Sequence, residues 1–197
     1  MEFKEAMMHR RSRYELTSTS PLNPDQLKAL LVHALNHTPS AYNAQGGRLL
    51  LALNEHHQAI WDALIALLKT RQSEERFAKS KAKIEQFKKA YGTVLFFNDL
   101  NVIKEYQKKY PKYAEQTELW SQQSHGMLQY VVWTSFADAK IGASLQHYNP
   151  LIDDAIKSLF AVPDSWKLTA QMPFGIAKGS PKEKHFKPIE TRLKVFE

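Results

Sequence analysis

A polar loop meets a buried strand in residues 39–54, which run Pro39-Ser40-Ala41-Tyr42-Asn43-Ala44-Gln45-Gly46-Gly47-Arg48-Leu49-Leu50-Leu51-Ala52-Leu53-Asn54. Residues 40–47 are polar and lack apolar periodicity, which predicts a loop. Residues 48–54 are short and mostly apolar, which suits a strand inside a sheet. Loops of this kind often carry functional side chains.

Two helices are predicted before this loop. A short one covers Phe3–His9 and runs into the basic stretch Arg10-Arg11-Ser12-Arg13. The second is better marked, because Asn23 can cap it and Pro24 fits its first turn. Its apolar side chains recur at helical spacing and form one stripe: Leu27, Leu30, Leu31, Ala34 and Leu35.

The rest of the chain alternates strands and helices, which makes the fold class α+β. Asn149-Pro150 repeats the cap-then-proline signature and predicts a helix from Pro150. The longest helix is expected to run through the core despite Gly126. The predicted elements are a helix over 57–70, a strand over 92–98, a helix over 119–139, a helix over 150–160 and a strand over 166–177.

One domain is expected over residues 1–197, since no linker or internal repeat divides the chain. The charged tail from about residue 178 to residue 197 keeps several apolar side chains, so we expect an arm docked on a surface. No apolar run is long enough for a membrane span and the N-terminus lacks a secretory leader, so a cytoplasmic location is expected. With no cysteine in the sequence, any redox chemistry must be carried by a cofactor.

The net charge of +7 favours anionic partners, which include nucleic acid, a membrane surface and a phosphate-bearing ligand. Much of the excess lies in Lys69–Lys89 and Lys104–Lys112. We interpret both stretches as solvated helix faces, and nucleic-acid binding is the alternative.

Familiar catalytic motifs are missing from the sequence. The seven glycines form neither a dinucleotide-binding fingerprint nor a phosphate-binding loop, and the histidines lack metal-ligand spacing, so no metal site is predicted. The adjacent His56 and His57 are expected to point to different faces. His125 and His147 lie among apolar residues and are interpreted as hydrogen-bonded packing residues.

Three segments taken together resemble the nitroreductase family: Arg10-Arg11-Ser12, the loop Pro39–Gln45, and Gly142-Ala143-Ser144-Leu145-Gln146-His147-Tyr148-Asn149-Pro150. The third segment and Tyr14 narrow the resemblance to the branch named after the yeast fatty-acid-repression mutant, whose bacterial members include stress-induced enzymes. The resemblance implies a central antiparallel sheet flanked by helices, in an intertwined homodimer with FMN bound at the subunit interface. It also implies that the C-terminal arm packs on the partner subunit.

The same resemblance assigns cofactor-binding residues. Arg10 and Ser12 would grip the phosphate, with Arg11 near the ribityl chain or the ring, which agrees with the donor geometry of a guanidinium. The loop residues that would bond the flavin ring from the partner subunit are Ser40, Asn43 and Gln45. Gly142, Leu145 and Gln146 would lie along the flavin, where glycine permits a close approach.

The C-terminal phosphate contact carries over only in part. Lys184 matches the family's Lys-x-Arg element, whereas Phe186 stands in place of the arginine, and Tyr14 replaces a basic residue found in other branches.

The activity implied is the ping-pong reduction of a nitroaromatic or quinone by NADH or NADPH through FMN, with no catalytic side chain required. Two alternatives stay open: a flavin-binding stress or regulatory protein with incidental reductase activity, and a basic nucleic-acid-binding protein.

Overall fold

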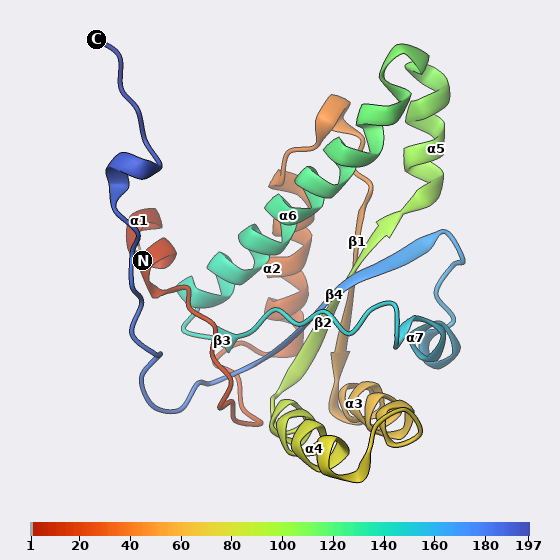
Figure 1. The fold of residues 1–197 in the computed structure, drawn as a ribbon, viewed down its shortest axis with the longest axis vertical. Helices are drawn as coiled ribbons and strands as arrows, with labels where there is room; N and C mark the ends of the chain where they lie inside the picture. The colour runs from red at the N-terminus through yellow and green to blue at the C-terminus, as the bar shows by residue number, and fades with distance from the viewer. Residues whose placement is uncertain (1) are drawn as a thin grey trace.

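The computed structural model describes residues 2–197 and centres on a four-stranded sheet in the order β1-β2-β4-β3. The strands are β1 (Gly47–Leu53), β2 (Gly92–Asp99), β4 (Trp166–Gly175) and β3 (Gly142–Ala143), and each pairs antiparallel with its neighbour. Figure 1 shows helices on both faces of this sheet. The predicted α+β class with a central antiparallel sheet is therefore confirmed.

Seven helices are present within residues 2–197. They are α1 (Phe3–His9), α2 (Pro24–His37), α3 (Asn54–Lys69), α4 (Glu74–Lys88), α5 (Leu100–Lys109), α6 (Ala114–Asp138) and α7 (Asp153–Phe160). Three short 3-10 turns accompany them: η1 (Ala41–Asn43), η2 (Pro111–Tyr113) and η3 (Ile189–Thr191). None of these helices combines the length and apolar content that a membrane crossing requires.

The buried strand β2 divides the core in two. Its side chains alternate, so Val94 and Phe96 face α2 and α6, whereas Leu95 and Phe97 face α3, α4 and α7. All eight residues of β2 are buried. This explains why β2 has a continuous apolar run instead of the alternating pattern of a half-exposed strand.

The cap of α2 forms as predicted. The side chain of Asn23 accepts a hydrogen bond from the Gln26 N–H at 2.9 Å, and the Gln26 side chain accepts one from the Asn23 N–H at 3.0 Å. These two bonds satisfy donors that the first turn of a helix leaves without partners.

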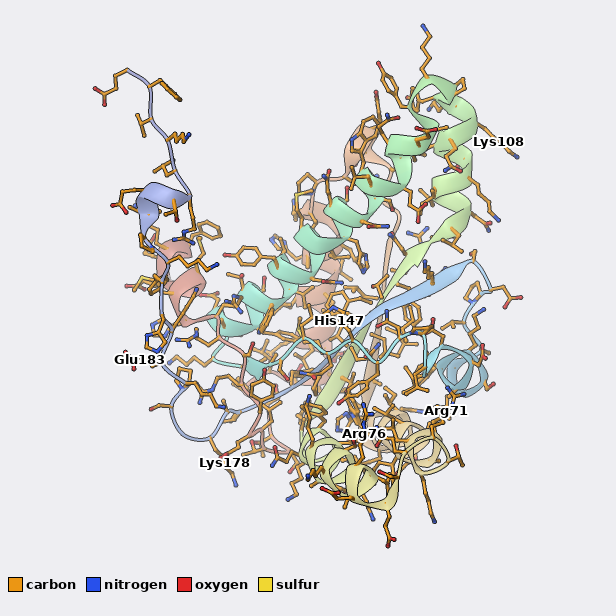
Figure 2. The ribbon with its side chains drawn as sticks, in the orientation of Figure 1. Arg71, Arg76, Lys108, His147, Lys178 and Glu183 are labelled. Carbon is orange, nitrogen blue, oxygen red and sulfur yellow. The ribbon has the colours of Figure 1, made fainter. Side chains whose placement is uncertain are left out.

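The prediction for residues 149–160 was wrong at its start. Asn149-Pro150 forms a cis peptide in a turn, and α7 begins only at Asp153. The side chain of Asn149 does not cap the helix, because it accepts a hydrogen bond from Gln171 Nε2 at 3.4 Å. The neighbouring His147 is exposed, so its interpretation as a packing residue was also wrong (Figure 2).

The other helical expectations hold with shifted ends. The long helix α6 begins at Ala114, five residues before the predicted start, and buries Leu128, Val132 and Phe136 in the core. The two basic stretches lie mainly on α4 and α5, whose charged side chains include the exposed Arg76 and Lys108 (Figure 2). His57 is buried while His56 is exposed, as predicted.

Candidate functional site

The N-terminal segment and the segment after α6 lie against each other. Ser12 forms a parallel bridge with Ala143, and the Arg13 N–H donates to the Ala143 carbonyl at 2.9 Å. Gly142 is needed here for packing, since a Cβ at that position would lie 2.5 Å from the Cβ of Ala177. Two of the three predicted segments are therefore brought together within one chain.

Arg10 lies at the end of α1 with its guanidinium over the ring of Trp133 on α6, 4.4 Å from the ring centroid. No hydrogen bond to this guanidinium is found within residues 2–197, so its N–H donors stay available. A cation held on an aromatic face is fixed in orientation without losing those donors. Sequence reasoning missed Trp133, because nothing in the pattern of α6 marks it as a partner of residue 10.

The tail runs beside the same segment. Arg11 donates to the Lys182 carbonyl, and Arg13 donates to the carbonyls of Lys178, at 3.0 Å, and Gly179. Figure 2 places Lys178 and Glu183 along this stretch of chain. Arg11 is thus engaged with the tail, two residues before Lys184. Lys184 itself is exposed, with its ammonium 5.0 Å from the ring of Phe186.

Gln146 is buried and holds its segment against β4. It exchanges two backbone hydrogen bonds with Gln171, at 2.7 and 2.9 Å, and its side-chain Nε2 donates to Ser144 Oγ at 3.1 Å. The fully buried Gln171 accepts from the Tyr148 N–H at 2.8 Å. Leu145, between Ser144 and Gln146, is half-buried. Gln171 was not predicted, since an amide inside an apolar strand gives no sign of its partners.

The loop that contains Ser40, Asn43 and Gln45 takes a tight shape. Tyr42, Asn43 and Gln45 have positive φ angles of 54°, 55° and 50°. Such left-handed backbone is uncommon outside glycine and tends to occur at functional sites. The Ser40 hydroxyl accepts a hydrogen bond from the Gln45 N–H at 2.9 Å and closes the turn.

This loop does not meet Arg10 within one chain. It packs on the first half of α6, where the Ala41 N–H donates to Ser124 Oγ at 3.4 Å, whereas Arg10 lies over Trp133 nine residues further on. At a rise of 1.5 Å per residue, the two points on α6 are about 14 Å apart. Figure 1 shows the loop and α1 towards opposite ends of α6.

A cleft opens beside the loop, between it, the end of β2, α5 and the first half of α6. Its volume is about 1020 Å³ when the solvent at its mouth is included. Aromatic rings line the outer part: Tyr42 stacks on Tyr110 with centroids 4.4 Å apart and planes 18° from parallel, and Trp120 and Tyr106 lie nearby. A flat aromatic molecule suits such a surface.

Polar side chains line the inner part of the cleft. Asn98 accepts a hydrogen bond from the Ser121 hydroxyl at 3.1 Å, and Arg48 forms an ion pair with Asp99 at 3.0 Å. His125 is only 5% exposed, and burial lowers its pKa to about 4, so its ring is neutral near pH 7. Its Nε2 is hydrogen-bonded to Thr169 Oγ1, while its Nδ1 has no partner in the described chain.

Comparisons with known proteins identify the family and the fold. A family model described as the nitroreductase family matches residues 7–176. The nitroreductase FRM2 of Saccharomyces cerevisiae is 29% identical over 93% of this chain and 92% of its own length. The structure of nitroreductase CinD from Lactococcus lactis in complex with nicotinic acid superposes with a TM-score of 0.92 at 34% identity, and both chains are covered completely. Its complex with 4-nitrophenol gives a TM-score of 0.89 at 35% identity, also over the whole of both chains.

Proposed function

The chain belongs to the nitroreductase family of oxidoreductases, and on that premise we propose that it binds FMN and reduces nitroaromatics or quinones with NADH or NADPH. The observation that carries the proposal is the distribution of the site along α6. Groups suited to a phosphate lie at one end of this helix, and an amide-bearing loop with an aromatic cleft lies at the other.

The phosphate end fits FMN by its chemistry. A flavin phosphate carries close to two negative charges, and the guanidinium of Arg10 offers a planar set of donors, with Ser12 two residues further along the same segment. Lys184 follows the part of the tail that Arg11 and Arg13 hold in place, and it would add a second positive charge.

The end of the site that would bind the flavin ring, formed by the loop of Ser40 and the cleft, requires a second copy of the chain. Because about 14 Å of α6 separates the two halves of the site, a homodimer in which each loop reaches its partner's phosphate end would complete two sites. Ser40, Asn43 and Gln45 would then bond the polar edge of the flavin ring, where amides can both donate and accept. The tail from residue 178 to residue 197 would pack on the partner subunit. Its own apolar side chains, which include Phe186 and Phe196, would then be buried.

The protein's part in the reaction is binding, orientation and exclusion of water. Bound FMN would supply the hydride chemistry, so that NADH or NADPH and the oxidised acceptor react one after the other, as ping-pong kinetics require. The stacked rings at the mouth of the cleft would orient a flat acceptor. The complexes of CinD with nicotinic acid and with 4-nitrophenol support an aromatic occupant.

The test begins with the purified protein. We expect a yellow preparation that releases one FMN per chain, a mass near twice 22.7 kDa in sedimentation, and parallel double-reciprocal plots when NADH and a quinone are varied together. A colourless protein that gains no affinity for FMN would refute the proposal.

The two alternatives give different results in the same assays. A flavin-binding stress or regulatory protein would be reduced once by NADH and then fail to turn over a nitroaromatic or quinone. A nucleic-acid-binding protein would bind DNA or RNA with a steep dependence on salt concentration.

A further inference from the structure

The inner wall of the cleft carries a row of hydroxyl groups on α6, those of Thr117, Ser121 and Ser124. Each hydroxyl proton is already donated to a hydrogen bond within the protein. The three hydroxyls lie four and three residues apart, which places them on one side of the helix. Each donates its single proton within the protein: Thr117 to the Tyr113 carbonyl at 2.8 Å, Ser121 to Asn98 Oδ1 at 3.1 Å, and Ser124 to the Trp120 carbonyl at 2.7 Å. What these groups can still offer a ligand is oxygen lone pairs, of which Ser124 already uses one to accept from the Ala41 N–H at 3.4 Å.

His125, next to Ser124, adds another group that can accept a hydrogen bond from a ligand but has no free proton to donate. Thr169 donates its hydroxyl proton to the Phe96 carbonyl at 2.9 Å, so its oxygen can only accept from His125, and Nε2 must carry the ring proton. The neutral ring therefore has Nδ1 as a lone-pair acceptor. That atom is buried without a partner in the described chain, and a buried acceptor in this state gains from any donor that reaches it.

The cation at this cleft does not offset the excess of acceptors. Among the described lining residues, Arg48 is the one Lys or Arg. Its guanidinium already donates to the carbonyls of Gln45 and Gly47, at 2.6 and 3.0 Å, and to Asp99 at 3.0 Å. The inner surface formed by Thr117, Ser121, Ser124 and His125 is therefore neutral and offers acceptors, while the N–H donors at the cleft include Asn98 Nδ2 and the indole of Trp120 in the aromatic outer part.

We propose that this acceptor-rich wall on α6 selects oxidised aromatic substrates that carry an O–H or N–H group in addition to the group that is reduced. The inference rests on the proposed function, because it takes the cleft to be the acceptor pocket. A substrate hydroxyl would donate to a wall oxygen or to His125. An ether of the same shape has no proton to donate, so its oxygen would face the lone pair of the wall without a hydrogen bond. Sites built to hydrogen-bond a substrate hydroxyl bind such an analogue more weakly for this reason.

The experiment uses two compounds that differ by one methyl group, 4-nitrobenzyl alcohol and its methyl ether. Neither ionises near pH 7, and the nitro group is the same in both. Dissociation constants are measured calorimetrically on the oxidised, flavin-bound full chain, without a nicotinamide. The alcohol is expected to bind roughly fivefold more tightly, the size of one neutral hydrogen bond. Equal affinities, or tighter binding of the ether, would overturn the inference.

Substitutions on α6 inside and outside the cleft test the role of the wall. Thr117→Val combined with Ser121→Ala removes two of the acceptors from the cleft and should lower the alcohol-to-ether ratio, with Ser124 and His125 left as the remaining acceptors. Thr134→Val makes the same kind of change at a buried position of α6 outside the cleft and should leave the ratio unchanged. A double variant that keeps the ratio but weakens FMN binding would show that the wall faces the cofactor, and the inference would be wrong.

Failure of the proposed function would look different. In that case the wild-type protein would hold no flavin, or would reduce neither compound. A flavin-bound protein that reduces both compounds without preference would keep the proposed function and refute only the selectivity of the wall.

Discussion

Arg10 is the residue on which the phosphate end of the proposed site depends. Its guanidinium has no partner except the face of Trp133 within the described chain. Replacing Arg10 with Ala should weaken FMN binding by about 2 kcal/mol, because a hydrogen bond to a charged group contributes about that much. Titration of the flavin-free protein with FMN, followed by flavin fluorescence, measures the change.

The control for this variant is Arg76→Ala, which removes an exposed arginine from α4, on the other side of the sheet (Figure 2). It lowers the net charge by the same amount and should leave FMN affinity unchanged. If both variants weaken binding equally, the effect of Arg10 is a general one of charge and not a contact.

Trp133 acts through Arg10. Trp133→Leu keeps a large apolar side chain on α6 but removes the aromatic face, so Arg10 should lose its fixed orientation. We expect FMN binding to weaken by about 1 kcal/mol, the size of a cation–π contact at a partly exposed site. In the Arg10→Ala background the same change should have almost no further effect, and additive losses in the double variant would contradict a shared role.

His57 shows how burial of one ring makes stability depend on pH. Its Nε2 faces the Lys88 carbonyl at 3.2 Å, and its Nδ1 faces Thr93 Oγ1, which also accepts from the indole N–H of Trp61 at 3.1 Å. Burial lowers the pKa of His57 to about 4 from the usual 6.5. The folded protein therefore holds this ring neutral where the unfolded chain would protonate it.

The consequence follows from linkage between protonation and folding. A folded-state pKa below the unfolded one gives stability that is complete above pH 6.5 and is lost as the pH falls towards 4. For His57 the loss between pH 7 and pH 5 should be about 2 kcal/mol. Urea unfolding at a fixed protein concentration should show a correspondingly smaller drop for His57→Gln than for the wild type. Equal drops would mean that His57 is not responsible.

At the scale of one element, α2 offers a direct test of a sequence signal. Its cap rests on the paired hydrogen bonds between Asn23 and Gln26. Asn23→Ala should lower the free energy of unfolding by about 1 kcal/mol, while Asn23→Asp keeps an acceptor at the same place and should cost little. Chemical denaturation of the two variants measures the difference, and similar losses would show that the cap contributes nothing specific.

The elements that could be predicted are those whose signal is local. The cap and stripe of α2 and the apolar runs of β1 and β2 are set by neighbouring residues, so their positions were right within a residue or two. The start of α7 was wrong because the side chain that resembled a cap is bonded to Gln171, 22 residues away. The two-residue strand β3 was missed for a related reason, since only pairing with β4 makes it a strand.

The site shows the same division. Arg10, Ser12 and the loop of Ser40 could be identified because their residue types match a known pattern in order. Trp133, His125 and the hydroxyl row of α6 could not, because each acquires its role from tertiary contacts and a long helix gives no hint of which side lines a cleft.

At the scale of the whole molecule, the tail is the part that a single chain leaves unexplained. Phe186 is 72% exposed and Phe196 is 91% exposed, although large apolar side chains gathered in one segment are usually buried against a surface. Removing residues 186–197 should weaken the proposed dimer, raising its dissociation constant on the order of tenfold or more, because several apolar side chains lose their burial. Sedimentation equilibrium measures this, and circular dichroism checks that the truncated chain still folds. An unchanged dissociation constant would show that the tail does not contribute to the dimer interface.

The length of α6 has a consequence for how this protein can vary. The helix reaches from the wall of the cleft to Trp133, on which the Arg10 guanidinium lies, and so fixes the distance between the two parts of the proposed site. Inserting one residue between Ser124 and Trp133 would turn one end against the other by about 100° and lengthen the helix by about 1.5 Å. Substitutions between the two ends leave this spacing unchanged, whereas an insertion or a deletion changes it.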